Sequence, residues 1–445
     1  MSRLAKPDAP RSPAPEPFND ARPAVTILTG FAPEATREAA EQLTRADPSL
    51  LVVAHDLTAL LVDGTVHRTV HDGTGLIEDE RLALEHGCIA CTVREDLLPA
   101  LVRLARTRPE SDIALVLPPS MEPETVAAAC SWCHVDGAPV TDALRIDSVV
   151  AVCDPATLLE TLDSDEDLAD RSLQAADDDN RSVADVAARQ IEYADTVLLW
   201  APRTEPAYEQ ARLAVLLQRL NPWARHLVVN LEAPLSAKPT DPSQDSAKPP
   251  ASGETAQWLS ARLRRSGGFD PDAPEPYGRG LEGYAVGCHE PEPDCGVVAA
   301  VYRARRPFHP ERFHQALPAI AGRTLRGRGH LWLAAQPDHI ACWESSGGGV
   351  SMGDLGRWLD ATPDEEWDES SPERRVNADL NWDGEFGDRE INLAFVGLHF
   401  AADELAAVLD SCLLTDAEVA EGRAAWREYH DPFAGCFESN ERNQE

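Results

Sequence analysis

Short apolar runs alternate with longer amphipathic stretches through the first half of the chain. Strands that alternate with helices in this way are typical of a parallel sheet covered by helices. The predicted strands are Val25–Leu28, Leu50–Val53, Ile113–Leu117, Val149–Val152, Thr196–Trp200 and His226–Val229. The predicted helices are Glu34–Ala46, Val93–Arg106, Glu122–Ala129, Val183–Tyr193 and Glu205–Leu220.

Two stretches of the chain lack this pattern. Residues 1–23 contain six prolines and no apolar periodicity, which predicts a disordered arm. Residues 233–256 are rich in Pro, Ser, Lys and Asp and almost free of apolar side chains, which predicts a linker. We therefore expect one domain over 24–232, a second over 257–436 and a tail over 437–445.

The second predicted domain has an order of helices and strands that is typical of an α+β fold, in which helices pack on one sheet. Its predicted helices are Trp258–Arg265, Pro310–Ile320 and Ala402–Cys412. Its predicted strands are Val297–Arg303, Gly329–Ala334, His339–Trp343 and Ile391–Leu398. In the first domain, the acidic stretch Asp163–Asp179 is interpreted as a surface insertion.

The charge balance excludes several classes of function. Of the 445 residues, 76 are acidic and 40 basic, and the formal net charge is −36. Phosphate backbones and anionic lipids repel such a chain, so direct nucleic-acid binding is not its main activity. No apolar run approaches the ~20 residues of a membrane span. Ten cysteines are too dilute for a disulfide scaffold. We expect a cytoplasmic protein with reduced thiols and no membrane partner.

The turn after the first predicted strand is the first place to look for a ligand, because ligands of α/β domains bind beyond the carboxyl ends of the strands. A phosphate-binding loop that starts at Gly30 needs glycine at 35, lysine at 36 and Ser or Thr at 37. The chain has Ala35, Thr36 and Arg37. Glu34 places a carboxylate near the helix start, where it competes with an anionic phosphate. A capped helix start is the favoured interpretation.

Cys88 and Cys91 are separated by two residues and precede a predicted helix, so both sulfurs could bind one soft cation, with the helix start favouring thiolate. A closed zinc site takes four ligands, which His86, Glu85 or distant groups would have to complete. From the residues alone, packed thiols are the favoured interpretation and a metal site is the alternative.

Other candidate motifs carry a weaker signal. The segment Cys130–His134 has the spacing of half a zinc site, and Cys288–Cys295 is similar, but packed thiols and a solvated acidic loop are the favoured interpretations. No Gly-x-Ser-x-Gly nucleophile elbow occurs. Single histidines such as His55, His67 and His314 are expected to be surface or core residues. We therefore assign no catalytic and no cofactor-binding residue.

Together these segments resemble the CobW-like metallochaperone GTPase family, whose members join a P-loop domain to a smaller C-terminal domain. The resemblance covers about residues 24–415. It implies a P-loop-NTPase-like parallel-sheet domain with a degenerate P-loop, followed by a smaller α+β domain. The matching blocks are Val25–Phe31, Glu85–Leu97, Val149–Pro155, Gln190–Asp195, Val301–Phe313, Arg326–Ala334 and Cys412–Thr415.

The groups that bind nucleotide in this family are missing at the matching positions. The Walker lysine and hydroxyl correspond to Thr36 and Arg37. The guanine-reading Asn-Lys-x-Asp corresponds to Trp200–Arg203, and the acidic switch segment with its glycine corresponds to Pro118–Met121. The resemblance therefore implies a pseudo-GTPase that neither binds GTP usefully nor hydrolyses it.

The family's Cys-x-Cys-Cys metal motif is reduced here, with Cys88 and Cys91 retained and Ala90 in the middle position. This resemblance implies zinc as the cofactor, bound by Cys88 and Cys91. Within the family, His67–Thr69 and Leu84–Leu98 are similar to actinobacterial members that recruit a ribosome hibernation factor under zinc limitation.

The resemblance implies a non-catalytic, zinc-responsive recruiter whose partner is a basic ribosome hibernation factor, and the ribosome through it. A chain with net charge −36 attracts a basic partner by complementary potential. The arginine clusters 303–306 and 323–328 are expected to be paired with the acidic surface. Two alternatives stay open: a zinc metallochaperone with a reduced cysteine site, and a still active GTP-binding protein with an unrecognised loop.

Overall fold

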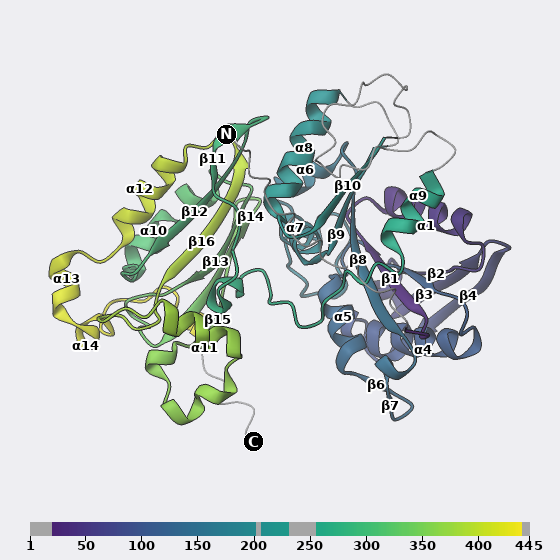
Figure 1. The fold of residues 1–445 in the computed structure, drawn as a ribbon, viewed down its shortest axis with the longest axis horizontal. Coiled ribbons are helices and arrows are strands. Elements are labelled where there is room, and N and C mark those ends of the chain that lie inside the picture. Colours follow the sequence, from purple (N-terminus) through teal and green to yellow (C-terminus); the bar gives the residue numbers. More distant parts are fainter. Residues whose placement is uncertain (1–19, 202–205, 231–254, 438–445) are drawn as a thin grey trace, which may run out of the picture.

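The computed structural model describes residues 20–201, 206–230 and 255–437 (Figure 1). Most of the predicted arm, linker and tail lies outside these residues. Among the helices within them, none combines the length and the apolar character that crossing a bilayer requires.

The first domain is built on an eight-stranded sheet with the order β10-β9-β8-β1-β5-β2-β3-β4. The strands from β10 to β2 are parallel, as the sequence pattern predicts, and β3 and β4 add an antiparallel hairpin beyond β2. The strands are β1 Ala24–Thr29, β2 Leu51–Asp56, β3 Thr65–Asp72, β4 Gly75–Ala83, β5 Ile113–Val116, β8 Arg145–Cys153, β9 Thr196–Ala201 and β10 Arg225–Asn230.

Helices pack on both faces of this sheet. One face is covered by α4, α5, α7 and α8, and the other by α1 and α9. A short hairpin, β6 and β7, follows α5. The bounds are α1 Pro33–Ala46, α2 Leu60–Asp63, α3 Ile89–Cys91, the π-helix η1 Thr92–Leu97, α4 Leu98–Thr107, α5 Pro123–Trp132, β6 His134–Val135, β7 Ala138–Pro139, η2 Val140–Asp142, α6 Leu158–Leu162, α7 Val183–Tyr193, α8 Ala207–Leu220 and α9 Thr255–Leu263.

Two features of this domain differ from the sequence prediction. The β3–β4 hairpin was not predicted, because the buried Arg68 interrupts the apolar alternation of Val66 and Val70. The helix predicted over Trp258–Arg265 was expected to open the second domain. In the structure it is α9, which packs against α1 and buries Leu259 within the first domain.

The second domain is an α+β unit, as predicted, on a six-stranded antiparallel sheet with the order β11-β12-β16-β13-β14-β15. An aromatic-rich core joins one face of this sheet to α10 and α12. The bounds are η3 Arg279–Glu282, β11 Glu290–Asp294, β12 Val297–Ala304, α10 Pro310–Ala321, β13 Arg326–Leu331, β14 His339–Ser346, β15 Gly349–Arg357, η4 Leu359–Ala361, η5 Asp364–Glu369, α11 Pro372–Leu380, β16 Ile391–Leu398, α12 Ala402–Cys412, α13 Asp416–Glu421, α14 Arg423–Trp426 and η6 Ala434–Phe437.

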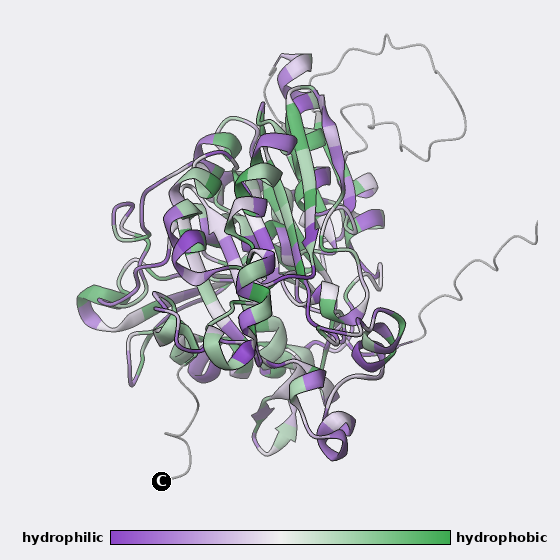
Figure 2. Ribbon diagram, turned by 90° about the vertical axis from the view of Figure 1, so that its left-hand side faces the viewer, coloured by the Kyte–Doolittle hydropathy of each residue, from purple (hydrophilic) through white to green (hydrophobic). Residues whose placement is uncertain are grey.

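The other face of the second sheet packs against α7 and α8 of the first domain. Arg326 Nη2 donates to Glu192 Oε2 of α7 at 2.7 Å, and Arg328 also pairs with Glu192. All three side chains are almost fully buried. These two arginines of the cluster 323–328 thus pair with carboxylates, but in the buried interface between the domains and not on the acidic surface where pairing was expected. Figure 2 shows hydrophobic positions concentrated along the strands and hydrophilic ones on the outer loops.

Candidate functional site

The turn between β1 and α1 has only three residues, Gly30 to Ala32, because α1 already begins at Pro33. A Cβ atom at Gly30 would lie 2.2 Å from the backbone oxygen of Val152, so only glycine fits at this point. In a phosphate-binding loop, the residues at these positions present free backbone N–H groups. Here the residues from Pro33 onward form the first turn of α1.

The side chains of this helix turn are engaged within the protein. Thr36 is buried, and its hydroxyl donates to the carbonyl oxygen of Ala32 at 3.1 Å. Trp200 Nε1 donates to Glu38 Oε2 at 2.9 Å, which ties α1 to the end of β9. Arg37 is exposed. The segment that follows Trp200 continues into residues 202–205, which are outside the described residues.

The segment after β5, where the family carries its acidic switch, is held by side chains of α7 and of the residues just before it. Gln190 Nε2 donates to the carbonyl oxygens of Pro119 at 2.8 Å and Met121 at 3.2 Å. Arg181 Nη2 donates to the carbonyl oxygen of Ser120 at 3.0 Å. Ser120 and Met121 are buried. These bonds fix the backbone of the segment.

Cys88 and Cys91 lie together, as their spacing predicts. Cys88 is the N-cap of α3, and its Sγ accepts the backbone N–H of Cys91 at 3.3 Å. The hydrogen bond with Cys88, burial and the nearby Glu95 raise the pKa of Cys91 to about 11. This raised pKa favours the neutral thiol of Cys91, in line with packed thiols, and opposes the thiolate that the metal-site alternative requires.

A complete zinc site is not formed by these two cysteines. In the described part of the chain, no three His, Cys, Asp or Glu side chains gather in a cluster that could hold a metal ion. Cys88 and Cys91 provide two of the four ligands that a closed zinc site takes. A zinc ion on this pair would need further ligands, which the described residues do not gather there in this arrangement.

The remaining cysteines fit the interpretation as packed thiols. Burial raises the pKa of Cys130 to about 12 and also raises the pKa of Cys288. The pKa of the half-buried Cys295 is raised as well, first by desolvation and then by Asp294. Raised values oppose thiolate formation, which metal binding requires.

A buried polar network next to the cysteine pair was missed by the sequence analysis. The helix predicted over Val93–Arg106 is interrupted by the π-helix η1, and the buried Asp96 of η1 faces the sheet. Its Oδ2 lies 2.9 Å from His55 Nε2 of β2, and it also pairs with Arg68 of β3. The available signal was a histidine at an inward position of a strand, in line with Leu51 and Val53.

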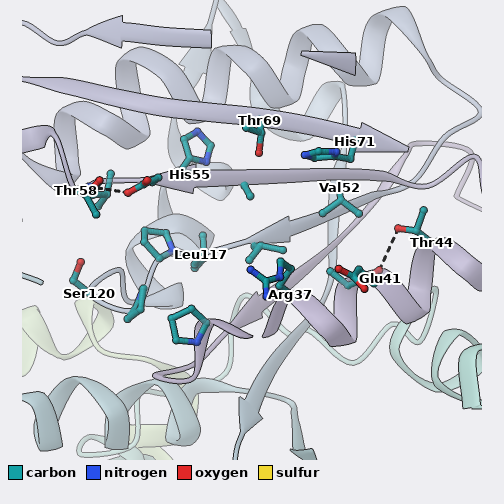
Figure 3. Close-up of a pocket in the computed structure, with 18 of the residues that line it drawn as sticks. Arg37, Glu41, Thr44, Val52, His55, Thr58, Thr69, His71, Leu117 and Ser120 are labelled. Carbon is teal, nitrogen blue, oxygen red and sulfur yellow. Dashed lines mark hydrogen bonds between the residues drawn. The ribbon is translucent and has the colours of Figure 1, made fainter. Parts of the chain in front are cut away.

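A groove of about 1150 Å³ lies beside the first turn (Figure 3). Half-buried Val52 and Ala54 of β2 and Val116 of β5 line it from the sheet, and Arg37 and Glu41 of α1 line it from the helix side. It continues to the segment after β5, through Leu117 and Ser120, and along β3, through Thr69 and His71. The groove therefore connects α1 with the segment after β5.

Comparison with known proteins identifies the fold family. Residues 38–227 match the nucleotide-binding domain of the CobW/HypB/UreG family, and residues 297–413 match the C-terminal domain of the cobalamin synthesis protein cobW. The zinc chaperone Rv0106 of Mycobacterium tuberculosis is 31% identical over 83% of this chain and 84% of its own length. The chain belongs to the CobW family. In this CobW-family chain, the match to the nucleotide-binding domain begins one residue after Arg37.

Other relatives of this CobW-family protein are similar over most of their length. The zinc-regulated GTPase metalloprotein activator 1 of Dictyostelium discoideum is 28% identical over 92% of this chain and 83% of its own length. Among solved structures, Zn(II)-bound YjiA GTPase from E. coli aligns with 88% of this chain and 99% of its own, with 15% identity and a TM-score of 0.33.

Proposed function

We propose that this CobW-family protein acts through contact with a protein partner, in response to zinc, and without GTP hydrolysis. The observation that carries the proposal is the three-residue turn between β1 and α1. A phosphate-binding loop needs free backbone N–H groups, a lysine and a hydroxyl that faces the metal ion. Here the loop residues are helical from Pro33, and the Thr36 hydroxyl is bonded to Ala32.

Two further observations support the loss of nucleotide binding. The segment after β5 is fixed by Gln190 and Arg181, whereas a nucleotide switch needs two arrangements. The match to the family's nucleotide-binding domain begins at residue 38, after the first turn.

The zinc part of the proposal is supported by the relatives and by the cysteine pair. Two relatives that align over most of this chain carry zinc in their names, as a zinc chaperone and a zinc-regulated activator. Cys88 and Cys91 bring two sulfurs together at the start of α3. A site with two ligands binds zinc more weakly than a closed site, which suits a protein that responds when zinc becomes scarce.

The partner that we propose is a basic ribosome hibernation factor, through which this protein reaches the ribosome. The net charge of −36 supports a basic partner and opposes direct contact with ribosomal RNA. Association should then weaken as the salt concentration rises. Affinity measurements with a purified hibernation factor, with and without a zinc chelator, test this part. Equal affinity in both conditions would contradict a zinc response.

Titration calorimetry of the full chain with GTP and Mg²⁺ tests the loss of nucleotide binding. We expect no binding stronger than about 1 mM, because neither a lysine nor a free N–H cradle meets the phosphates. Release of phosphate in the same samples is expected to equal that of buffer. Micromolar affinity would show that the chain is an active GTP-binding protein with an unrecognised loop.

The second candidate function, a zinc chaperone with a reduced site, is favoured by the Cys88–Cys91 contact. It predicts stoichiometric zinc in the purified protein and loss of that zinc in Cys88→Ser. Cys436→Ser is the matched control, because Cys436 is also half-buried but lies in the second domain. Metal analysis of both variants distinguishes the functions: less than one zinc per chain in the wild-type protein excludes the chaperone.

A further inference from the structure

The outer face of α11 is an exposed apolar surface. Eleven large hydrophobic side chains are exposed in the described residues, and three of them fall within seven positions of each other. These are Val376, Leu380 and Trp382, with exposed fractions of 58%, 78% and 43%. Val376 and Leu380 lie one turn apart on α11, and Trp382 follows the helix end. Single exposed hydrophobic residues are ordinary, but a group of them marks a contact surface. Figure 1 shows α11 at the lower end of the second domain.

The opposite face of α11 holds the helix in place. Asn377 Nδ2 donates to the carbonyl oxygens of Gly280 at 3.1 Å and Leu281 at 3.0 Å. Arg305 Nη2 donates to the carbonyl oxygen of Asn381 at 2.7 Å, and Ser371 caps the helix N-terminus. The outer apolar side chains are therefore not needed to anchor the helix.

A second aromatic ring extends this surface. The ring centroids of Trp367 and Trp382 are 6.0 Å apart, with an angle of 39° between the ring planes. Trp367 Nε1 donates to the carbonyl oxygens of Leu359 at 3.1 Å and Thr362 at 3.2 Å, which holds its ring in position. Tryptophan is among the residue types that contribute most to binding energy at protein interfaces.

Carboxylates surround the α11 surface, which we define as Trp367, Val376, Leu380 and Trp382. Residues 360–390 contain twelve acidic residues and three arginines. Two of the arginines are engaged inside the segment, Arg375 with Asp368 and Arg389 with Asp360. Exposed carboxylates flank the apolar positions, at Glu366, Glu369, Glu373, Asp379 and Glu385.

We propose that the α11 surface docks a cationic amphipathic helix of a partner protein. The apolar side chains match the apolar face of such a helix, and the carboxylate rim matches lysines and arginines at its borders. The same carboxylates repel phosphate backbones and anionic lipid headgroups. The inference rests on the proposed function in that it locates the surface for the basic partner.

Binding of a synthetic helix to the full-length protein tests the docking surface. The probe is a labelled peptide of leucine and lysine of about five helical turns, with all leucines on one face. The control peptide has the same composition in scrambled order, so its charge is equal but its apolar face is lost. Fluorescence anisotropy at several salt concentrations measures both affinities. We expect roughly tenfold tighter binding of the amphipathic peptide.

Variants locate the binding to the α11 surface. The double variant Val376→Ser with Leu380→Ser should bind the amphipathic peptide roughly tenfold more weakly and bind the scrambled peptide with unchanged affinity. Trp132→Ser is the matched control, because Trp132 is 78% exposed but lies at the end of α5 in the first domain. Glu373→Gln with Asp379→Asn should reduce the salt dependence. Circular dichroism checks that each variant is folded.

Each outcome bears on the proposal. Equal affinity for the two peptides, or equal weakening by Trp132→Ser, would overturn the α11 surface as a docking site. These results do not depend on nucleotide. If the protein binds the peptide at α11 and also binds GTP, the α11 surface stands and the proposed function is wrong. If it binds neither the peptide nor GTP, the α11 surface is wrong and the loss of nucleotide binding stands.

Discussion

Arginine side chains organise much of the interior of this protein. Arg326, Arg328 and Arg389 are among its largest fully buried side chains. Arg326 meets Glu192 and Arg389 meets Asp360, and Arg389 Nε also donates to the carbonyl oxygen of Pro337 at 2.7 Å. The planar guanidinium makes several fixed bonds at once, which a lysine ammonium cannot do. A buried arginine in this protein is therefore a connector between elements.

At the residue scale, the carboxylate of Glu418 makes the stability of the protein depend on pH. The hydrogen bond from Arg312, together with bonds from Thr415 and against the opposing effect of burial, lowers the pKa of Glu418 to about 2, from its ordinary value of 4.5. The ionised form is thus favoured by folding, and its contribution is complete above pH 4.5 and is lost as the pH falls toward 2. We expect Glu418→Gln to lower the free energy of unfolding by about 1 kcal/mol at pH 7.

Urea unfolding of Glu418→Gln and wild type between pH 7 and pH 3 measures this difference. Glu428→Gln is the control, because Glu428 is exposed on the neighbouring segment. A difference that stays constant down to pH 3 would contradict the role of the ionised carboxylate.

At the scale of elements, the start of α1 decides what the first turn can bind. The amphipathic pattern predicted a helix from Glu34, and the structure begins it at Pro33. The sequence therefore anticipated the helix that follows β1 to within one residue of its start. It did not anticipate that α9 completes this domain, because the stretch that separates α9 from the rest of the domain has the composition of a linker.

The packing of α9 predicts that its leucines stabilise the first domain. Leu263 is fully buried beside α1. Leu263→Ala should lower the free energy of unfolding by about 2 to 5 kcal/mol, because the substitution leaves a cavity. Leu61→Ala, at an exposed position of α2, should change it by less than about 0.5 kcal/mol. Equal values for the two variants in chemical unfolding would show that α9 is not part of this core.

At the scale of the whole molecule, the two domains are joined by a packed interface and by a connecting segment that carries Glu275. Glu192 of α7 binds arginines of β13, and β12 and β16 pack on α8. The segment between α9 and η3 passes α5, where Glu275 is hydrogen-bonded to Glu124. Two carboxyl groups in contact share a proton more easily than they both ionise. The junction of the domains is therefore sensitive to pH.

Glu124 is the group that makes the stability of this junction depend on pH. Burial, and next the charge of Glu275, raise the pKa of Glu124 to about 7, from an ordinary value of 4.5. The folded protein holds the proton more tightly than the unfolded chain, so stability is complete below pH 4.5 and declines as the pH rises through 7. Glu124→Gln should gain about 1 to 2 kcal/mol relative to wild type at pH 8 and nothing at pH 4.5.

Thermal and urea unfolding across this pH range check the effect of Glu124→Gln, with Glu110→Gln as an exposed control. An equal gain in both variants would indicate a general response to the net charge and not the contact with Glu275.

Patterns within a few residues were enough to locate most strands and helices, the helix that follows the first strand and the contact between Cys88 and Cys91. Burial on one face repeats at the period of a strand or a helix, so such elements are visible locally. Distant pairing decided the rest: the β3–β4 hairpin, the place of α9 and the Asp96 network with His55. In each case a buried charge or a distant segment supplies the partner, and the residues adjacent in sequence do not identify that partner, although the inward position of His55 on its strand was a partial signal.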